Sequence, residues 1–176
     1  PELGGMQSLM WGLSRELSKN FMIKVFADHT ENHKDFDEQA SFSIERVGGI
    51  KLLRKYRKAQ LINEFIKENK IEGIIADHWK SLELIRSNKK KYCLIHSKEI
   101  NHPKGTNLNK RVLNVLDNVE KVIANSEFTK NLAIECGVNQ SKIIVINPGI
   151  DPIKELNKKS LDKVESLLKV KTPRLI

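Results

Sequence analysis

The 176-residue chain is long enough to bury the core of one domain. Hydrophobic residues make up 39% and charged residues 30%, which excludes an intrinsically disordered chain, and no apolar run approaches the roughly 20 residues that cross a bilayer. The formal net charge of +9 admits nucleic acid, a membrane surface or a phosphorylated substrate as a partner. Because lysine outnumbers arginine and Asn and Ile are frequent, we attribute much of this charge to biased amino-acid usage.

The two cysteines do not form a metal or disulfide motif. Cys93 lies in an apolar stretch and Cys136 near a predicted helix end, with no CxxC pair. We expect both to be reduced, half-buried thiols of a cytoplasmic protein. The chain shows no signal peptide, and because it begins at Pro1 we expect its natural N-terminus to be missing.

Two glycines open the first predicted helix, which continues through Met6 and Gln7. Its apolar positions are Leu9, Met10, Leu13 and Leu17. Backbone amides at a glycine-rich helix start can approach a phosphate closely, so Gly4 and Gly5 are candidate anion-binding residues. A simple turn is the alternative interpretation.

Two strands are predicted next, at residues 21–27 and 42–47, the first from β-branched residues and the second from alternation of apolar and polar residues. His29 and His33 in the intervening loop are four residues apart, a spacing that could hold a metal on a helix. No apolar periodicity surrounds them and no Glu follows His29, so we predict no metal site.

The longest helical pattern covers residues 50–69. Its predicted buried face consists of Leu52, Tyr56, Ala59, Ile62 and Ile66. Its first half is strongly basic, through Lys51, Arg54, Lys55, Arg57 and Lys58. A solvated surface helix is one interpretation, and a patch that meets anionic lipid headgroups is the other.

Residues 71–76 predict a buried strand, followed by Asp77, His78, Trp79 and a helix to about residue 86. Polar residues at the carboxyl end of a parallel strand line the crevice where open α/β sheets bind ligands. His78 and Trp79 are therefore candidate cleft residues, although they could equally cap and pack the next helix.

A second buried strand begins near Tyr92 and ends at His96, which is followed by Ser97, Lys98 and Glu99. His96 is a candidate cleft residue for the same reason, with a structural hydrogen bond as the alternative. A polar loop at residues 101–107 and a helix from about residue 108 to 119 come next.

Residues 122–151 read as strand, helix, strand and turn. Ser126 suits a helix N-cap, Glu127 complements the helix dipole, and Gly137 suits a left-handed helix stop. Residues 142–146 form the second apolar run, and Asn147, Pro148 and Gly149 predict a turn. Two strands joined by a helix indicate a parallel βαβ unit with a right-handed crossover.

These motifs, in this order, resemble the N-terminal domain of family 4 retaining glycosyltransferases of the GT-B fold. The similar features are the Gly-Gly before the first helix, the "IIADHW" strand end, the strand that ends at His96, and the "NPGID" turn that leads to a second domain. The resemblance implies an α/β, Rossmann-like, doubly wound and mostly parallel sheet, whose first strand would precede Pro1. It also implies a domain boundary: residues 1–154 form the acceptor-side domain, and residues 155–176 a linker helix and the start of the donor-binding domain.

The resemblance further implies transfer of a sugar, with retention, from a nucleotide-sugar donor to a saccharide or lipid-linked acceptor, without a cofactor or metal. Gly4 and Gly5 would face the donor diphosphate and His96 the donor sugar. Cleft or acceptor-side positions would be Met6, Gln7, His78, Trp79, Ser97, Lys98 and Glu99. Bacterial cell-surface polysaccharide or lipopolysaccharide synthesis, in the cytoplasm or at the inner membrane face, would be the setting. The family's two donor-binding glutamates, eight residues apart, have no counterpart in the right context, so we expect this chain alone to be inactive.

Two other classes remain open at this stage. One is a different nucleotide-binding α/β protein, although no G-x-G-x-x-G motif is present. The other is a basic nucleic-acid- or membrane-binding module without catalysis. Scattered basic residues, 6% aromatic content and the lack of a recognition motif argue against nucleic acid.

Overall fold

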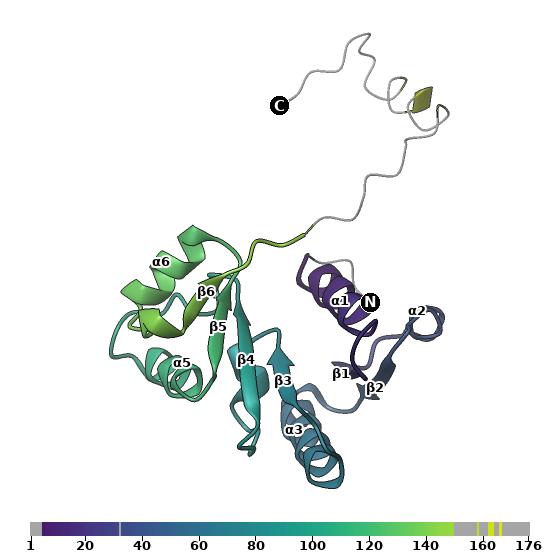
Figure 1. The fold of residues 1–176 in the computed structure, drawn as a ribbon, viewed down its shortest axis with the longest axis horizontal. Helices are drawn as coiled ribbons and strands as arrows, with labels where there is room; N and C mark the ends of the chain where they lie inside the picture. The colour runs from purple at the N-terminus through teal and green to yellow at the C-terminus, as the bar shows by residue number, and fades with distance from the viewer. Residues whose placement is uncertain (1–4, 32, 150–157, 159–161, 164–165, 167–176) are drawn as a thin grey trace.

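The computed structural model describes residues 5–31 and 33–149, together with Lys158, Asp162, Lys163 and Ser166, which are helical. Helices and strands alternate along the chain (Figure 1). The helices are α1 (Gly5–Leu17), α2 (Lys34–Asp37), α3 (Lys51–Glu68), α4 (Trp79–Leu82), α5 (Asn107–Asp117), α6 (Glu127–Glu135) and the 3-10 helix η1 (Gln140–Lys142). The strands are β1 (Lys24–Asp28), β2 (Ser43–Val47), β3 (Gly73–Ala76), β4 (Lys90–Ile95), β5 (Lys121–Ala124) and β6 (Ile143–Val145). The predicted boundary at residues 154 and 155 lies outside the described residues.

The strands form two parallel sheets flanked by helices, which confirms the predicted α/β class. β1 pairs with β2, and the larger sheet has the order β3-β4-β5-β6. One continuous sheet was expected, but within the described residues β1 and β3 do not pair with each other. Each of these two strands therefore has one edge without a strand partner in the part of the chain that the structure describes.

The core lies on the larger sheet, where β4 and β5 are the central strands. Cys93 and Ile95 of β4 and Val122 and Ala124 of β5 are fully buried. Strands buried in this way are typical of parallel sheets covered by helices. Both cysteines are free, and both are buried rather than half-buried as expected. Burial raises the pKa of the Cys93 thiol far above its usual value.

The helix that follows β5 begins and ends as its sequence predicts. The Ser126 hydroxyl accepts the backbone N–H of Thr129 at 3.2 Å, so Ser126 is the N-cap of α6. Gly137 has φ +104°, the left-handed conformation that terminates helices and favours glycine. The strand that follows, β6, is shorter than the predicted run, and residues 147–149 are not assigned as a turn.

The first predicted strand begins later than expected, at Lys24. Phe21 and Met22 are 52% and 102% exposed, so their apolar side chains face solvent, whereas the first four residues of β1 are half-buried. The helix after Trp79 is also shorter than predicted and ends at Leu82. In both places the apolar pattern extends beyond the residues that form the strand or the helix.

The predicted buried face of α3 is only half correct. Ala59 is buried, and Ile62 and Ile66 pack against the core. Leu52 and Tyr56, in the first half of the helix, are 84% and 62% exposed, so their prediction as buried residues was wrong. No described element covers these two side chains, and the periodicity of the helix alone could not reveal that.

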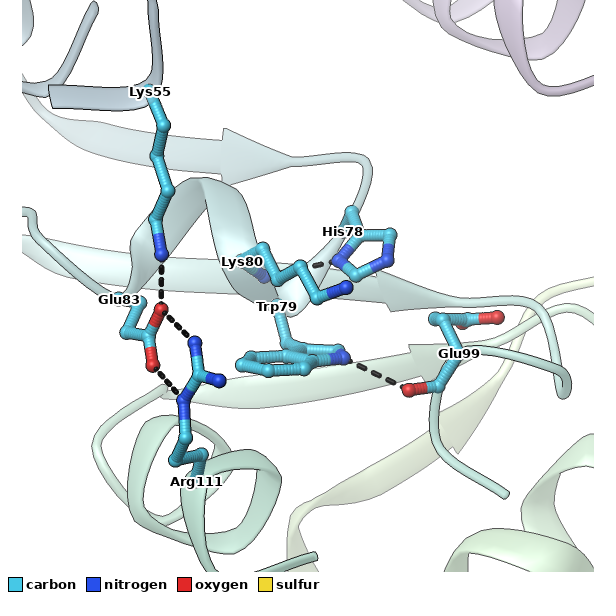
Figure 2. Close-up of polar contacts among 7 residues, drawn as sticks. All are labelled: Lys55, His78, Trp79, Lys80, Glu83, Glu99 and Arg111. Carbon is cyan, nitrogen blue, oxygen red and sulfur yellow. Dashed lines mark hydrogen bonds and ion pairs between the residues drawn. The ribbon is translucent and has the colours of Figure 1, made fainter. Parts of the chain in front are cut away.

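Three helical segments are joined through the carboxylate of Glu83, directly after α4 (Figure 2). Arg111 of α5 donates to it from Nε at 2.6 Å and from Nη2 at 2.9 Å, and Lys55 of α3 pairs with the same group. The Arg111 guanidinium also lies 5.4 Å from the centre of the buried Trp79 ring. Donation from Arg111, helped by Lys55, lowers the pKa of Glu83 from 4.5 to about 2.

We predict that Glu83→Gln lowers the free energy of unfolding by about 1–2 kcal/mol near neutral pH, because two cations lose a shared counter-charge. The pKa of Glu83 is lower in the folded than in the unfolded protein. Its contribution is therefore fully present above about pH 4.5 and disappears as the pH falls toward 2. Urea unfolding between pH 7 and pH 3 should show a smaller loss of stability in the variant than in the wild type. Glu127→Gln, which removes a surface pair with Lys130, is the control and should cost under about 0.5 kcal/mol.

Candidate functional site

The pairing of β4 with β5 brings two polar residues to the same edge of the larger sheet. Ile95, the last residue of β4, is directly opposite Ala124, the last residue of β5. His96 and Asn125 are the next residues of each chain segment. Because both strands run in the same direction, these two residues lie at the carboxyl edge, where open α/β sheets bind ligands.

A cavity of about 450 Å³ lies at this edge. It is lined by Gly5, Met6, Leu9, His96, Asn125 and Pro148, and we call it the His96 cavity. Among these lining residues only His96 and Asn125 have polar side chains. An apolar cavity with a few polar groups is the usual form of a small-molecule site.

His96 combines a fixed backbone with an unsatisfied ring nitrogen. Its backbone N–H donates to a carboxylate oxygen of Glu99. Its Nε2 is buried and has no hydrogen-bond partner among the described residues. A buried polar atom without a partner is costly, so His96 is suited to a partner that a ligand supplies.

The loop after β4 is held in an uncommon conformation. Ser97 has φ +91°, a value that few residues other than glycine adopt. Its carbonyl accepts the backbone N–H groups of Ile100 and Asn101, at 3.2 and 3.1 Å. The carbonyl of Glu99 accepts the Trp79 indole N–H at 2.9 Å (Figure 2). The core thus fixes the loop that carries His96, and backbone strain of this kind is typical of functional sites.

His78 and Trp79 have structural contacts. His78 is the N-cap of α4, where its Nδ1 accepts the Lys80 backbone N–H at 3.0 Å. Burial lowers the pKa of His78 below its usual 6.5, against the opposing effect of Glu99 and Asp77. Trp79 is fully buried and lies beneath Lys80, whose Nζ is 5.4 Å from the ring centre (Figure 2).

A second cavity, of about 340 Å³, lies at the opposite end of the same strands. Its lining includes Lys89, Lys90, Asp117 and Glu120, near the starts of β4 and β5. Ligands of open α/β sheets bind at the carboxyl edge, so we take the His96 cavity as the functional site.

No group of three or more His, Cys, Asp or Glu residues suited to a metal is found in the described part of the chain. The rings of His29 and His33 lie 4.5 Å apart in an edge-to-face arrangement. His33 Nδ1 is within hydrogen-bond distance, 2.6 Å, of the Thr30 carbonyl oxygen. These two histidines therefore form a ring contact and a local backbone contact.

The protein-family model for "Glycosyltransferase Family 4" matches residues 3–154. This range includes most of the chain and all residues of the site described above. The chain belongs to glycosyltransferase family 4. No curated protein matches it.

Solved structures of Anabaena Alr3699/HepE have the same fold. The complex with UDP aligns with a TM-score of 0.70 at 17% identity and covers 94% of this chain and 47% of that chain. The complex with UDP and glucose has a TM-score of 0.71 at 18% identity, and the alignment covers 94% of this chain and 47% of that chain. The complex with UDP-glucose has the same TM-score and identity, and the alignment covers 96% of this chain and 47% of that chain. This family 4 chain thus spans about half the length of these neighbours and has the fold of the N-terminal half of a GT-B protein.

The structure brings together some of the residues that the sequence singled out. Gly5, Met6, His96 and Pro148 line the cavity, and Gly4 lies outside the described residues. The predicted site residues that do not line it are Gln7, His78, Trp79, Ser97, Lys98, Glu99, Asn147 and Gly149. Sequence reasoning missed Asn125, although it follows a strand just as His96 does.

The helix cap at His78 leads to a prediction about pH. The pKa of His78 is lower in the folded than in the unfolded protein, so its contribution to stability is present above about pH 6.5 and is lost as the pH falls through the folded-state pKa. Protonation also removes the Nδ1 lone pair that accepts from Lys80. We predict that His78→Asn, which keeps an acceptor, makes stability less dependent on pH between 7.5 and 5. His78→Ala should cost about 1 kcal/mol at pH 7.5. Urea unfolding at the two pH values measures both effects, and parallel pH profiles for wild type and His78→Asn would contradict the assignment.

Proposed function

We propose that this chain is the acceptor-side half of an enzyme that transfers a sugar from a nucleotide-sugar donor to a saccharide or lipid-linked acceptor with retention of configuration. The observation that carries the proposal is the His96 cavity at the carboxyl edge of the sheet. It combines a helix N-terminus with an imidazole nitrogen that has no partner among the described residues. Membership of glycosyltransferase family 4 supports it. The structural neighbours were solved with UDP and with UDP-glucose, which supports a nucleotide sugar as donor.

The first turn of α1 suits the diphosphate. Gly5 and Met6 line the cavity at the start of this helix, and the first backbone N–H groups of an α-helix in general have no intrahelical partner. These groups and the helix dipole stabilise negative charge, which grows on the diphosphate as it leaves the sugar. A Cβ atom added to Gly5 would meet no atom within 4 Å outside its chain neighbours and the backbone of its own helix, so open space lies beside Gly5.

In the proposed reaction the bond between the anomeric carbon and the diphosphate oxygen breaks. A bond to an acceptor hydroxyl oxygen forms on the same face of the sugar, and the acceptor proton leaves with the nucleoside diphosphate. His96 would orient the sugar through hydrogen bonds to its hydroxyl groups. No metal or other cofactor takes part in this scheme.

The proposed setting is the synthesis of a bacterial cell-surface polysaccharide or lipopolysaccharide, in the cytoplasm or at the inner face of the membrane. Donor contacts from a second domain would complete the site, because this chain covers only 47% of its structural neighbours. We therefore expect this chain by itself to be inactive.

We predict that His96→Ala lowers the rate of nucleoside diphosphate release by about 100-fold in the complete protein, because the sugar loses an orienting contact. The assay offers a panel of nucleotide sugars with and without a chelator and measures nucleoside diphosphate. His102→Ala is the matched control, since His102 lies in the same loop and does not line the cavity. Release that is unaffected by His96→Ala would make His96 a structural residue. No release from any donor would contradict the proposed function.

A membrane contact is a second part of the proposal, and it rests on the exposed side chains of α3. The α3 apolar patch, as we call it, consists of the N-cap residue Ile50 and of Leu52, Leu53 and Tyr56 in the helix. Their exposed fractions are 70%, 84%, 61% and 62%. Exposed apolar groups gathered on one helix are typical of an interaction surface. No helix in the described part of the chain is long and apolar enough to cross a membrane.

The basic residues of α3 are less available than the sequence suggests. Arg54 and Lys58 pair with Asp28, at 3.5 and 2.5 Å, and Lys55 pairs with Glu83. The two remaining members of the predicted basic patch, Lys51 and Arg57, have no ion pair within the described residues. Apolar side chains beside such cations suit the surface of an anionic bilayer, which tyrosine also favours.

We predict that Leu52→Glu and Leu53→Glu each weaken binding to vesicles with anionic lipid by about tenfold or more, because a buried leucine contributes roughly 1.5–3 kcal/mol. Co-sedimentation at moderate salt measures this. Phe128→Glu is the matched control, because Phe128 is 70% exposed on α6, away from α3 (Figure 1). Equal binding to anionic and neutral vesicles would overturn the anionic-membrane proposal. Salt-sensitive retention on heparin without vesicle binding would favour the nucleic-acid alternative.

A further inference from the structure

Asn125 lines the His96 cavity, although the sequence did not single it out as a candidate site residue. It follows the last residue of β5 and precedes the N-cap of α6. Its carbonyl accepts the Asn147 Nδ2 group at 3.3 Å, which ties its backbone to the segment that carries Pro148. Asn125 is therefore fixed beside the cavity by its neighbours on both sides.

Hydrogen bonds fix which way the Asn125 amide faces. Its Oδ1 lies 2.6 Å from the hydroxyl of Thr129, which is 2% exposed. This distance is typical of O–H···O and short for N–H···O, so Oδ1 rather than Nδ2 meets the hydroxyl. The Ser126 hydroxyl already accepts from Thr129 N–H, so its own hydrogen is free to donate, and Asn125 Oδ1 at 3.4 Å and Thr129 Oγ1 at 3.1 Å are its acceptors.

With its oxygen engaged by hydroxyl donors, the amide has both N–H groups of Nδ2 left. The Asn125 Nδ2 atom makes no hydrogen bond within the described residues and is not sealed off from solvent. An independent observation at the same cavity is the buried Nε2 of His96, which also has no hydrogen-bond partner in the part of the chain that the structure describes. Two side chains with unmet hydrogen-bonding capacity thus line one otherwise apolar cavity.

We infer that Asn125 is a substrate-contacting residue whose Nδ2 donates a hydrogen bond to an oxygen of the nucleotide sugar, and that Thr129 is the residue that positions it. This inference rests on the proposed function. The chemistry that Asn125 recognises is an oxygen acceptor, which either a diphosphate oxygen or a sugar hydroxyl supplies. The substitution Asn125→Asp, which replaces Nδ2 by a carboxylate oxygen, distinguishes these two acceptors. The new negative charge repels a diphosphate much more than a sugar hydroxyl.

The test uses the complete protein and the nucleotide sugar that the donor panel identifies. Asn125→Ala should lower kcat/KM for that donor by about 10–100-fold, and Asn125→Asp by at least as much. If Asn125 meets the diphosphate, Asn125→Asp will also weaken binding of the nucleoside diphosphate alone. If it meets the sugar, affinity for the nucleoside diphosphate will stay at the wild-type value. Asn88→Asp, an exposed position near the opposite edge of the sheet, is the charge-matched control and should match the wild type.

The positioning role of Thr129 has its own pair of variants. Thr129→Val keeps the shape but removes the hydroxyl, so the amide can rotate and kcat/KM should fall about 5–10-fold. Thr129→Ser restores the hydroxyl and should recover most of that loss, which a purely structural role in packing would not predict. Thermal unfolding of each variant confirms that it is folded.

The outcomes separate this inference from the function on which it rests. The inference would be overturned if the wild type releases nucleoside diphosphate and both Asn125→Ala and Asn125→Asp keep the wild-type kcat/KM. That result would leave the proposed function intact. A change in KM for the acceptor alone would also overturn it, because Asn125 would then not contact the donor. A wild type that is inactive with every donor would overturn the proposed function, and with it this assignment.

Discussion

The parallel pairing of β4 with β5 is the interaction on which the site depends. Ile95 and Ala124 are opposite each other and fully buried, so both strands leave the core at the same level. The first polar residues after them, His96 and Asn125, consequently lie at the same carboxyl edge and line one cavity. A shift of one residue in this register would turn the side chains of the shifted strand to the opposite face of the sheet, so packing of the core also fixes the geometry of the site.

The start of α6 contributes to both stability and the site. Ser126 caps the helix, and the same turn places the Thr129 hydroxyl against the Asn125 amide. A buried Thr hydroxyl needs a partner, and an amide beside a cavity needs a fixed orientation, so one hydrogen bond meets both requirements. The loop after β4 uses a similar arrangement, since Glu99 holds the backbone of His96 through its carboxylate and the core Trp79 through its carbonyl.

Local signals in the sequence predicted the features that depend on nearby residues. Ser126 and Gly137 are examples, because a cap and a left-handed stop require only the adjacent turn. His96 was found because an apolar run identifies a strand and its end. The exposure of Leu52 could not be predicted, since periodicity shows that a helix has an apolar face but not what covers it. The division of the sheet between β1 and β3 depends equally on partners far away in the sequence. Asn125 was missed because an Asn before an N-cap has a ready local explanation.

The distribution of satisfied and unsatisfied polar groups separates the supporting structure from the site. Glu83 meets two cations, and the buried Asn109 donates to the Cys136 carbonyl at 2.9 Å, so these groups stabilise the helices that surround the sheet. In contrast, the buried Nε2 of His96 has no partner among the residues that the structure describes, and the strained backbone of Ser97 follows directly. Folding alone would favour removing both features, since each costs free energy and neither improves packing. Their position together at the carboxyl edge, beside a cavity, is explained if a bound ligand supplies the missing partner.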